Sequence, residues 1–595
     1  MIPKSFSCSL LLVLAMLGAG PALGATVNVG LGSYSTTLPP GAVGPQSSSG
    51  QNIAPKVSST FSLPVQTNDF WSSLIYPFYG SPHSNVLYAH PLMVKAIGTG
   101  LQIGHTATHV FAASDYLYPF SLQLTVGVAG LTSPQTQAHG YGDWTATARW
   151  ADASRTMEAT FGHGLPFVFC SVTGGDAVVT PEGAFTTWYN QGGTLGLTIQ
   201  GRHYGVFAPT GSTWTGTGPL QSSLNGQDYL SIALLPDAQP VTLELFRKHA
   251  YAFVTDSRVQ WQYDEAAATL HTTYSYVTEL KESNGTSVNQ TMTALYRHQW
   301  LNTSAPLTGY SYQSPNGQMK LFEGSTFTTE LPFSGVLPAL PDRGDYSRAE
   351  LLAHAQAVAA ETLPAGPTYE NGKAIARFAH LVHIADQLGA TAARDHFLAE
   401  IKSRLEDWFT VGGAQQYVYN DTWDVLTGYP SGYGADNQIN DHHFHSAYAV
   451  MGAATVAQYD STWASPDHWG GMVNLLIRDG NNWDRSDTRF PFLRSHDAYA
   501  GHSWAAGHGD FGDGNNQESS SESMNFATAV ILWGEATGQT DIRDLGVYLH
   551  ATEKTAVEQY WFDVDNAVFP AAYPHVAIGM VWGGKGAFAT WFSGD

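Results

Sequence analysis

The sequence predicts a multidomain protein of β and α structure, in which an N-terminal β-sandwich is followed by a helical C-terminal domain. Its 595 residues exceed the usual size of one domain, so two or three domains are expected. Up to about residue 335, short apolar runs alternate with polar residues and are separated by Gly and Asn, as in antiparallel strands. Beyond a Pro-rich stretch at 331–341, apolar residues recur with the 3.6-residue period of helices.

The first 24 residues have the features of a secretory signal peptide. Lys4 supplies the positive charge, residues 10–17 the apolar core, and residues 22–25 the small side chains around a cleavage site. The apolar core is too short for a membrane-spanning helix, and no later segment has a comparable unbroken apolar run. We therefore expect cleavage near Gly24–Ala25, secretion into the extracellular medium and no membrane partner.

The rest of the N-terminal half divides into three segments. A Gly/Ser/Pro-rich stretch covers 25–60, and the predicted β-sandwich domain covers 61–264. Within the sandwich, residues 122–128 and 259–263 alternate apolar and polar side chains, as strands with one buried face do. Many short strands of this kind are typical of a large sandwich. Residues 265–340 are less regular, and form either a small linking domain or a linking sheet.

Residues 341–595 carry seven predicted helices. They cover 347–363, 371–388, 393–409, 441–459, 467–477, 517–537 and 541–561. The connections between them are long and rich in Gly and aromatic residues, whereas the loops of helix bundles are short. An α/α toroid with active-site loops at one end fits this pattern better than a compact bundle does.

The composition excludes several classes of partner. The chain has 26 Lys and Arg against 49 Asp and Glu, a formal net charge of −23, which argues against nucleic acid and anionic membranes. Charged residues make up only 13% of the chain, about half the usual share, while Tyr (29) and Trp (17) are abundant. This balance is typical of secreted proteins that handle neutral, hydroxyl-rich ligands. Cys170 is the only cysteine outside the signal segment, so an intramolecular disulfide and a cysteine-based zinc site are excluded and a buried thiol is expected.

Two carboxylates four residues apart stand out in the run 515–523. If a helix begins at Asn515 or Asn516, Glu518 and Glu522 lie on one face about a turn apart. Like charges at this spacing mildly destabilise a helix, so a functional role would explain them. The structural alternative is that acidic residues in a first turn interact favourably with the helix dipole.

A second cluster, at 440–445, lies where the helix predicted at 441–459 begins. His443 and His445 form a His-x-His pair of the kind that opens metal-dependent amidohydrolase sites, but there the pair ends a strand, whereas here the pattern is helical. The other functional interpretation makes Asp441 a catalytic acid, with His445 one turn later on the same helical face. The structural alternative is an N-capping Asp followed by surface histidines.

Together, the two clusters resemble a known enzyme family. Residues 494–525 read RSHDAYAGHSWAAGHGDFGDGNNQESSSESMN, and NDHHFH stands at 440–445. These motifs are similar to those of glycoside hydrolase family 81, the endo-β-1,3-glucanases, and QTNDFWSSL at 66–74 and YRHQW at 296–300 extend the resemblance. The resemblance implies an N-terminal β-sandwich, a small linking domain and a C-terminal (α/α)6 barrel. It also implies hydrolysis of internal β-1,3 linkages with inversion at the anomeric carbon.

By the same resemblance, the catalytic acid falls on Asp441 and the catalytic base on Glu518, with His445 and Glu522 at supporting polar positions. An inverting pair implies a carboxyl separation of roughly 6.5–9.5 Å, with the acid in the less solvated surroundings. No metal and no cofactor is expected. The predicted substrate-binding residues are Asn440, His502, Trp504, Tyr433 and Trp423.

Several alternatives stay open at this point. The aromatic residues beside the motifs either stack on sugars or pack within the loops, and Asp436 or Asp497 is the next candidate acid should Asp441 lie far from Glu518. The whole chain is either a catalyst, a non-catalytic β-glucan-binding protein, or a metal-dependent hydrolase that uses the cluster His442–His445. In each case we expect a monomer.

The sequence departs from the family pattern in two places. Ser446–Ala447 stands where a Tyr-Gly pair usually follows the NDHHFH motif. The sequence also ends at Asp595, where family members continue with the last barrel helices, so an incomplete barrel is expected.

Overall fold

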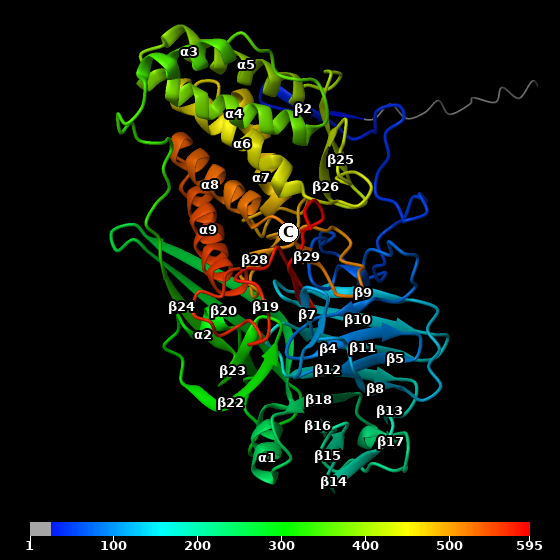
Figure 1. Ribbon diagram of the computed structural model, residues 1–595. Helices are drawn as coiled ribbons and strands as arrows, with labels where there is room; N and C mark the ends of the chain where they lie inside the picture. The colour runs from blue at the N-terminus through cyan, green and yellow to red at the C-terminus, as the bar shows by residue number, and fades with distance from the viewer. Residues whose placement is uncertain (1–24, 595) are drawn as a thin grey trace, which may run out of the picture.

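The structure is a computed structural model that describes residues 25–594. Figure 1 shows β-sheets in its lower half and helices in its upper half, with the C-terminal end of the chain between them. The predicted signal peptide lies outside the described residues. Within residues 25–594, no helix combines the length and apolarity needed to cross a membrane.

Two antiparallel sheets make up most of the N-terminal part. The larger has eight strands in the order β14-β15-β16-β18-β12-β11-β10-β9, and the smaller has six in the order β17-β13-β8-β5-β4-β3. The larger comprises β14 (Phe185–Gln191), β15 (Thr194–Ile199), β16 (Arg202–Phe207), β18 (Tyr229–Leu235), β12 (Phe167–Thr173), β11 (Thr156–Gly162), β10 (Thr145–Ala151) and β9 (Thr136–Tyr141). The smaller comprises β17 (Leu220–Ser222), β13 (Ala177–Pro181), β8 (Leu122–Val128), β5 (Gly100–Gly104), β4 (Met93–Ile97) and β3 (Val86–Leu87). Buried and less buried side chains alternate along strands such as β11 and β13, so both sheets contribute to one core.

Two smaller sheets follow the sandwich strands in the sequence. One has the order β19-β20-β24 and the other β21-β23-β22. Their strands are β19 (Ala252–Asp264), β20 (Thr269–Leu280), β24 (Thr326–Pro332), β21 (Met292–Leu295), β23 (Gly317–Glu323) and β22 (Leu307–Ser314). Helix α1 (Pro240–His249) precedes these strands in the sequence, and α2 (Arg297–Trp300) lies between β21 and β22. Figure 1 places α9 above this part of the molecule, where it adjoins β19, β20 and β24.

The seven helices predicted in the C-terminal part are confirmed, with differences at their ends. They are α3 (Arg348–Val358), α4 (Thr368–Gln387), α5 (Thr391–Trp408), α6 (His442–Tyr459), α7 (Gly471–Asn481), α8 (Ser520–Thr537) and α9 (Thr540–Tyr560). The helix expected from residue 467 starts at Gly471, because a π-helical turn at Pro466–Gly470 with a non-helical His468 precedes it. Helix α6 is buried along nearly its whole length, and packs against α4 on one side and α8 on the other.

Sheets of mixed origin join the two halves. One sheet has the order β1-β2-β25-β26. It combines the N-terminal strands β1 (Thr26–Val29) and β2 (Gly32–Ser35) with β25 (Gln416–Asn420) and β26 (Val425–Tyr429) of the helical part. A second such sheet has the order β29-β30-β31-β7-β6. It joins β29, the strand just before Glu518, to the hairpin β6–β7 of the N-terminal part. These strands are β29 (Asn516–Gln517), β30 (Met580–Trp582), β31 (Lys585–Ala587), β7 (Asp115–Leu117) and β6 (Val110–Ala112). A short hairpin of β27 (His496–Asp497) and β28 (His502–Ser503) lies in the loop between α7 and α8.

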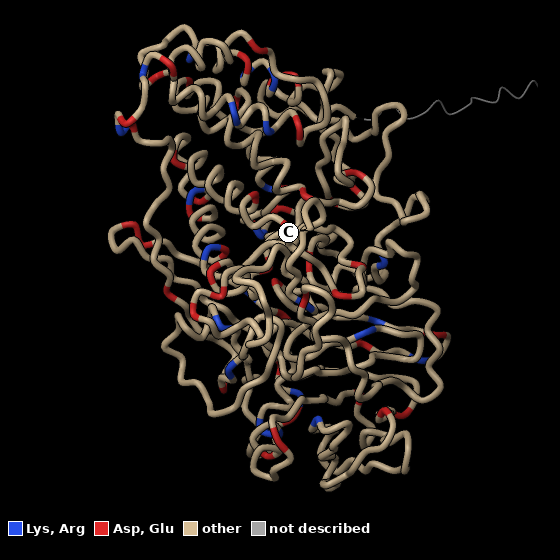
Figure 2. The backbone as a smooth tube through the Cα atoms, in the orientation of Figure 1, with Lys and Arg blue, Asp and Glu red and all other residues tan. Residues whose placement is uncertain are grey.

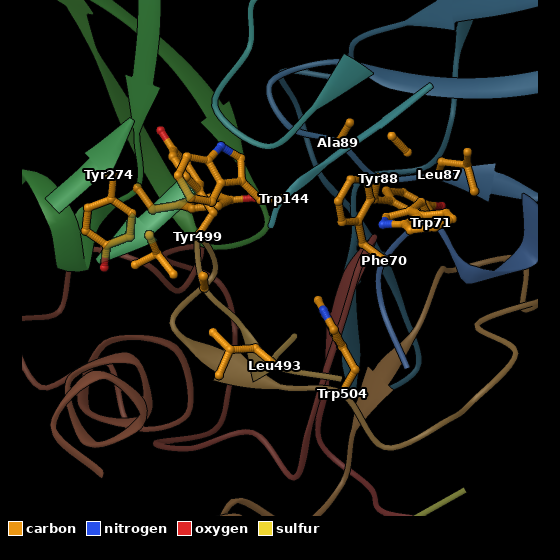
Figure 3. Close-up of a cluster of buried hydrophobic side chains, with 14 of the residues drawn as sticks. Phe70, Trp71, Leu87, Tyr88, Ala89, Trp144, Tyr274, Leu493, Tyr499 and Trp504 are labelled. Atoms are coloured by element: carbon orange, nitrogen blue, oxygen red, sulfur yellow. The ribbon is translucent and has the colours of Figure 1, made fainter. Parts of the chain in front are cut away.

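Large aromatic side chains fill the boundary between the parts. Figure 3 shows Trp144, which immediately precedes β10, packed together with Tyr274 of β20 and Tyr499 of the α7–α8 loop, with Phe70 and Trp504 nearby. The Trp144 and Tyr499 rings lie 5.5 Å apart, and both side chains are fully buried. One hydrophobic core therefore runs from the sheets into the loop that carries the GHSWA motif.

Candidate active site

Asp441 stands at the start of α6 in a strained backbone. The helix begins at His442, and Asp441 is its N-cap residue with a left-handed φ of 61°. Ile439, two residues earlier, has a φ of 56°, a conformation that costs a β-branched residue about 1–3 kcal/mol. Because the Asp441 side chain makes no capping bond to α6, its carboxyl is available for chemistry.

Glu518 precedes helix α8 instead of lying within it. Asn516–Gln517 form strand β29, and α8 begins at Ser520, so the predicted helix start at residue 515 or 516 is wrong. Pairing of β29 with β30 holds this segment extended. Glu518 and Glu522 therefore do not share one helical face, and the dipole argument applies to Glu522 alone.

Ala505 connects the backbones of the two carboxyl-bearing segments. Its carbonyl accepts a hydrogen bond from Asp441 N–H over 3.0 Å, and its N–H donates to the Asn516 carbonyl over 2.8 Å. Asn68, from the segment before the sandwich strands, adds a second support. Its amide nitrogen donates to the carbonyls of Ile439 (3.0 Å) and Ala505 (3.2 Å). The strained loop before Asp441 is thus held by both Ala505 and Asn68.

Asp441 and Glu518 line the same open pocket. Its volume is about 320 Å³. The lining residues are Tyr433, Gln438, Asn440, Asp441, Ala505, Ala506, Phe511, Asn516, Glu518 and Trp591. Two carboxyls, three amides and three aromatic rings facing one cavity can bind a neutral polyhydroxylated ligand and transfer protons to it.

The two carboxyls titrate differently because their surroundings differ. Burial raises the pKa of Asp441 well above its usual value, and the nearby charges of Glu518 and Glu522 raise it further. Burial also raises the pKa of Glu518, to about 7, with Glu522 again contributing. Burial and two like charges thus favour the protonated form of Asp441, which suits an acid, while Glu518, with a pKa of about 7, is partly ionised at neutral pH, which suits a base.

Glu522 lies in the first turn of α8 and is held by two tyrosines. It accepts hydrogen bonds from Tyr369 Oη of α4, over 2.8 Å, and from Tyr448 Oη of α6. Because these contacts occupy one of its oxygens, Glu522 acts on the pocket through its charge and position.

His445 is buried behind the pocket, one turn along α6 from Asp441. Its Nδ1 lies 3.1 Å from Thr368 Oγ1, and its ring packs 5.1 Å from that of Tyr369. Burial and the neighbouring His442 lower the pKa of His445 to about 3, so its imidazole is neutral. A neutral ring can hydrogen-bond and pack here without adding charge beside Asp441.

The other histidines of the cluster have separate partners. His442 contacts Asp479 Oδ2 (2.6 Å) and the Ala435 carbonyl (2.7 Å), whereas His443 contacts Ser503 Oγ (3.1 Å). All are buried, so the alternative of surface histidines is wrong. Among residues 25–594, no group of three or more His, Cys, Asp or Glu side chains is arranged to hold a metal ion.

Two of the five predicted substrate-binding residues line the pocket, namely Tyr433 and Asn440. The Tyr433 side chain is 59% exposed and its hydroxyl donates to Glu370 Oε1, which fixes the ring at the pocket edge. Asn440 Oδ1 accepts from Gly507 N–H over 3.2 Å.

The other three are buried in the core. Trp504 Nε1 donates to Asp497 Oδ2 over 3.0 Å, and the His502 ring packs 4.5 Å from that of Trp504. Trp423 lies 4.5 Å from the Tyr76 ring and donates to the Ile53 carbonyl. Their burial argues against the predicted contact with sugar, and they belong to the packing alternative instead.

Some pocket residues were not among the predicted site residues. Gln438 adjoins the NDHHFH motif and could have been found from proximity. Phe511 and Asn516 lie within the long motif but were not predicted to bind substrate, and Trp591 stands 73 positions after Glu518 with no local signal. It reaches the pocket only because β30 and β31 return the chain beside β29.

Neither alternative acid lines this pocket. Asp497 is buried against His163, whose Nε2 lies 3.0 Å from Asp497 Oδ2, and this contact helps lower the pKa of the Asp497 carboxyl. Asp436 lines a different cavity, together with Tyr429 and Gln416. Asp441 therefore remains the candidate acid.

Comparisons with known proteins identify the family of this chain. Residues 349–595 match the family model described as the glycosyl hydrolase family 81 C-terminal domain. A glucan endo-1,3-beta-D-glucosidase of Thermobifida fusca is 45% identical over 580 residues, which cover 96% of this chain and 76% of the relative. One of the same name from Acetivibrio thermocellus is 43% identical, over 94% of this chain and 72% of the relative.

A solved structure is similar over the same extent. A mutant of the glycoside hydrolase family 81 protein CtLam81A from Clostridium thermocellum superposes with a TM-score of 0.91 at 41% identity, covering 96% of this chain and 79% of that one. Similarity of this degree in both sequence and structure means that the chain belongs to glycoside hydrolase family 81.

Proposed function

We propose that this protein hydrolyses internal β-1,3-glucosidic bonds of glucans, with Asp441 as general acid, Glu518 as general base, and inversion at the anomeric carbon. Membership of the family, and relatives named glucan endo-1,3-beta-D-glucosidase, make it an endo-1,3-β-glucanase. The observation that supports the roles is the pair of unequal carboxyls on one pocket: burial and two like charges raise the pKa of Asp441 well above its usual value, while Glu518, with a pKa of about 7, is partly ionised at neutral pH.

The proposed reaction uses one water and no covalent intermediate. Asp441 donates its proton to the glycosidic oxygen, which leaves as a hydroxyl, while Glu518 removes a proton from a water on the opposite face of the sugar. The oxygen of this water forms the new bond to the anomeric carbon as the bond to the leaving oxygen breaks. A carboxyl separation of roughly 6.5–9.5 Å leaves room for the water. Glu522 and His445 serve as positioning residues in this scheme.

The finer features of the protein are also proposals. We infer that α3–α9 form part of an (α/α)6 barrel, because α4, α6, α8 and α9 pack against one another in chain order. Residues 1–24 direct secretion, and the protein acts as a monomer on β-1,3-glucan in the extracellular medium. These inferences come from the sequence pattern, and from the match to the family.

The test is to follow laminarin cleavage by proton NMR with the wild-type enzyme and with Glu518→Gln. The wild type is expected to release α-anomeric reducing ends first, whereas Glu518→Gln keeps its fold and loses about a hundredfold or more in kcat. Initial β-anomer would show retention and overturn the water mechanism. A Glu518→Gln variant with wild-type kcat would overturn the assignment of the base.

A further inference from the structure

A row of aromatic rings leads away from the carboxyl pocket. The Trp591 ring, at the pocket, lies 6.2 Å from Phe511, which lies 4.7 Å from His508. His508 stacks on Phe78 at 4.1 Å with 4° between the planes, and Phe78 contacts Tyr79 at 4.9 Å. We name these five residues the aromatic ridge. It starts in the catalytic part and ends in the segment before the sandwich strands.

The two ends of the ridge are exposed and its middle is buried. Trp591 is 61% exposed and Tyr79 is 57% exposed, whereas Phe511 is half-buried and Phe78 and His508 are buried. Isolated exposed aromatics are common on protein surfaces and need no explanation. Here, however, the exposed rings are joined by packed rings, and one of them already lines the pocket.

Each exposed ring is fixed in place. Trp591 Nε1 donates to Oδ1 of Asn516, which lies two residues before Glu518, over 3.4 Å. The Trp591 ring also contacts the Trp582 ring at 5.6 Å. At the other end, the Tyr79 ring packs against Phe78 (4.9 Å) and His508 (6.3 Å), and its backbone N–H donates to Asp510 Oδ2 over 3.0 Å. Rings packed in this way lose little conformational entropy when a ligand stacks on them.

The charges beside the ridge are already paired. Lys585 Nζ lies 3.0 Å from Asp513 Oδ2 and 3.6 Å from Asp115 Oδ2. Figure 2 shows acidic and basic residues dispersed over the molecule, without a block of one sign. Such a surface suits a neutral ligand with apolar faces and hydroxyl edges, which is the chemistry of a pyranose chain.

From this geometry we infer that the aromatic ridge is a binding surface for the glucan chain beyond the carboxyl pocket, which makes the enzyme more efficient on long β-1,3-glucans than on short ones. Trp591 would stack the sugar next to the pocket, and Tyr79 a sugar farther along the chain. This inference rests on the proposed function, since the ridge extends the proposed substrate site.

The test compares kcat/KM on laminarin and on laminaritetraose for Tyr79→Ala and Trp591→Ala. Loss of one stacking ring is expected to cost about threefold to tenfold in efficiency. For Tyr79→Ala this loss is expected mainly in the KM for laminarin, so the laminarin-to-tetraose ratio falls. For Trp591→Ala, next to the pocket, both substrates are expected to lose efficiency.

Phe562→Ala serves as the matched control. Phe562 is 55% exposed and lies after α9, outside both pocket and ridge, so neither substrate should respond. Unchanged melting temperatures show that the variants fold. If the ratio of kcat/KM on laminarin to kcat/KM on laminaritetraose stays at the wild-type value in Tyr79→Ala, the inference that the aromatic ridge binds glucan is overturned. Failure of the wild type to cleave either substrate would instead overturn the proposed function, so the two failures are distinguishable.

Discussion

At the scale of single residues, the proposed chemistry depends on how strongly each carboxyl is desolvated. Asp441 and Glu518 both have raised pKa values because burial disfavours their charged forms. Asp441 shifts further, since it feels the charges of both Glu518 and Glu522 in addition to burial. Glu522 is therefore an electrostatic partner of both groups, although it does not line the pocket.

The first prediction concerns the pH profile. Glu518 must be ionised to accept a proton, and its pKa is about 7, so kcat/KM should fall as the pH drops below about 7. Glu522→Gln removes the like charge that raises this pKa, and the acid limb should move to lower pH. The measurement is kcat/KM on laminarin from pH 4 to 9. On the acid limb, kcat/KM is expected to fall by about tenfold for each pH unit. An acid limb that stays in place would mean that Glu522 does not set the pKa of Glu518.

The second prediction concerns stability. The folded-state pKa of Glu518, about 7, lies above the ordinary value of 4.5, so the folded protein holds this proton more tightly than the unfolded chain does. The free energy of unfolding should therefore fall as the pH rises from about 4.5 to 7. Glu518→Gln has no carboxyl to ionise, so its free energy of unfolding should exceed that of the wild type by at most about 2 kcal/mol at pH 8, after allowance for solvent screening. Urea unfolding of both proteins at pH 4 and pH 8 measures this difference in stability. The same difference in stability at both pH values would contradict the prediction.

At the scale of elements, the sheet that contains β29 determines where Glu518 lies. Strand β29 pairs with β30, β30 with β31, and β31 with β7 of the N-terminal part. A strand of two residues is not stable alone, so its position depends on these neighbours. Glu518, the proposed base, is thus placed by chain segments more than 60 residues after it and about 400 residues before it.

The third prediction follows from the close packing in this sheet. A Cβ on Gly586 of β31 would come within 2.4 Å of the Tyr116 ring, so Gly586→Ala must push β31 away from β7. Overpacking of this kind costs about 1–3 kcal/mol. We expect a lower melting temperature together with a reduced kcat, measured by calorimetry and on laminarin. Gly512→Ala is the control, because nothing lies within 4 Å of its added Cβ. If both variants kept full activity, the sheet would not position the base.

At the scale of the whole molecule, the N-terminal part contributes directly to the catalytic loops. Arg485, in the loop after α7, pairs with Asp143 of the sandwich at 2.6 Å, and Asp424 accepts a hydrogen bond from Val65 N–H over 2.8 Å. Asn68 reaches still nearer to the site, through the carbonyls of Ile439 and Ala505. The segment that precedes the sandwich strands therefore supports the strained loop before Asp441.

The fourth prediction tests this support. Asn68→Asp keeps the shape of the side chain but loses the amide donor to two buried carbonyls, which costs about 1–3 kcal/mol. Because one of these carbonyls belongs to the strained Ile439, we expect kcat on laminarin to fall about tenfold or more. The control Asn190→Ala changes an exposed asparagine of β14 and should leave kcat and melting temperature unchanged. A normal kcat in Asn68→Asp would show that the loop holds its shape without the sandwich.

Sequence alone was sufficient for the features that depend on local pattern. The change of period near residue 335 predicted the strands and the seven helices, because burial of one face imposes that period on any chain. The motifs around Asp441 and Glu518 identified the family, which the comparisons confirm. Exposed and buried aromatics carry no distinguishing local pattern, and this is why Trp423 and Trp504 were selected and Trp591 was missed.

Only the tertiary structure decided how these pieces meet. It made 516–517 a strand instead of a first helical turn, because pairing with β30 satisfies backbone groups that a helix start would leave open. It brought Trp591 to the pocket and Asn68 to the loop before Asp441, and it raised the pKa values of Asp441 and Glu518 through burial and nearby carboxylates. Residue types and their order determined which chemistry was possible in this chain, while long-range packing determined which carboxyls have raised pKa values, since desolvation and charge proximity depend on the folded chain.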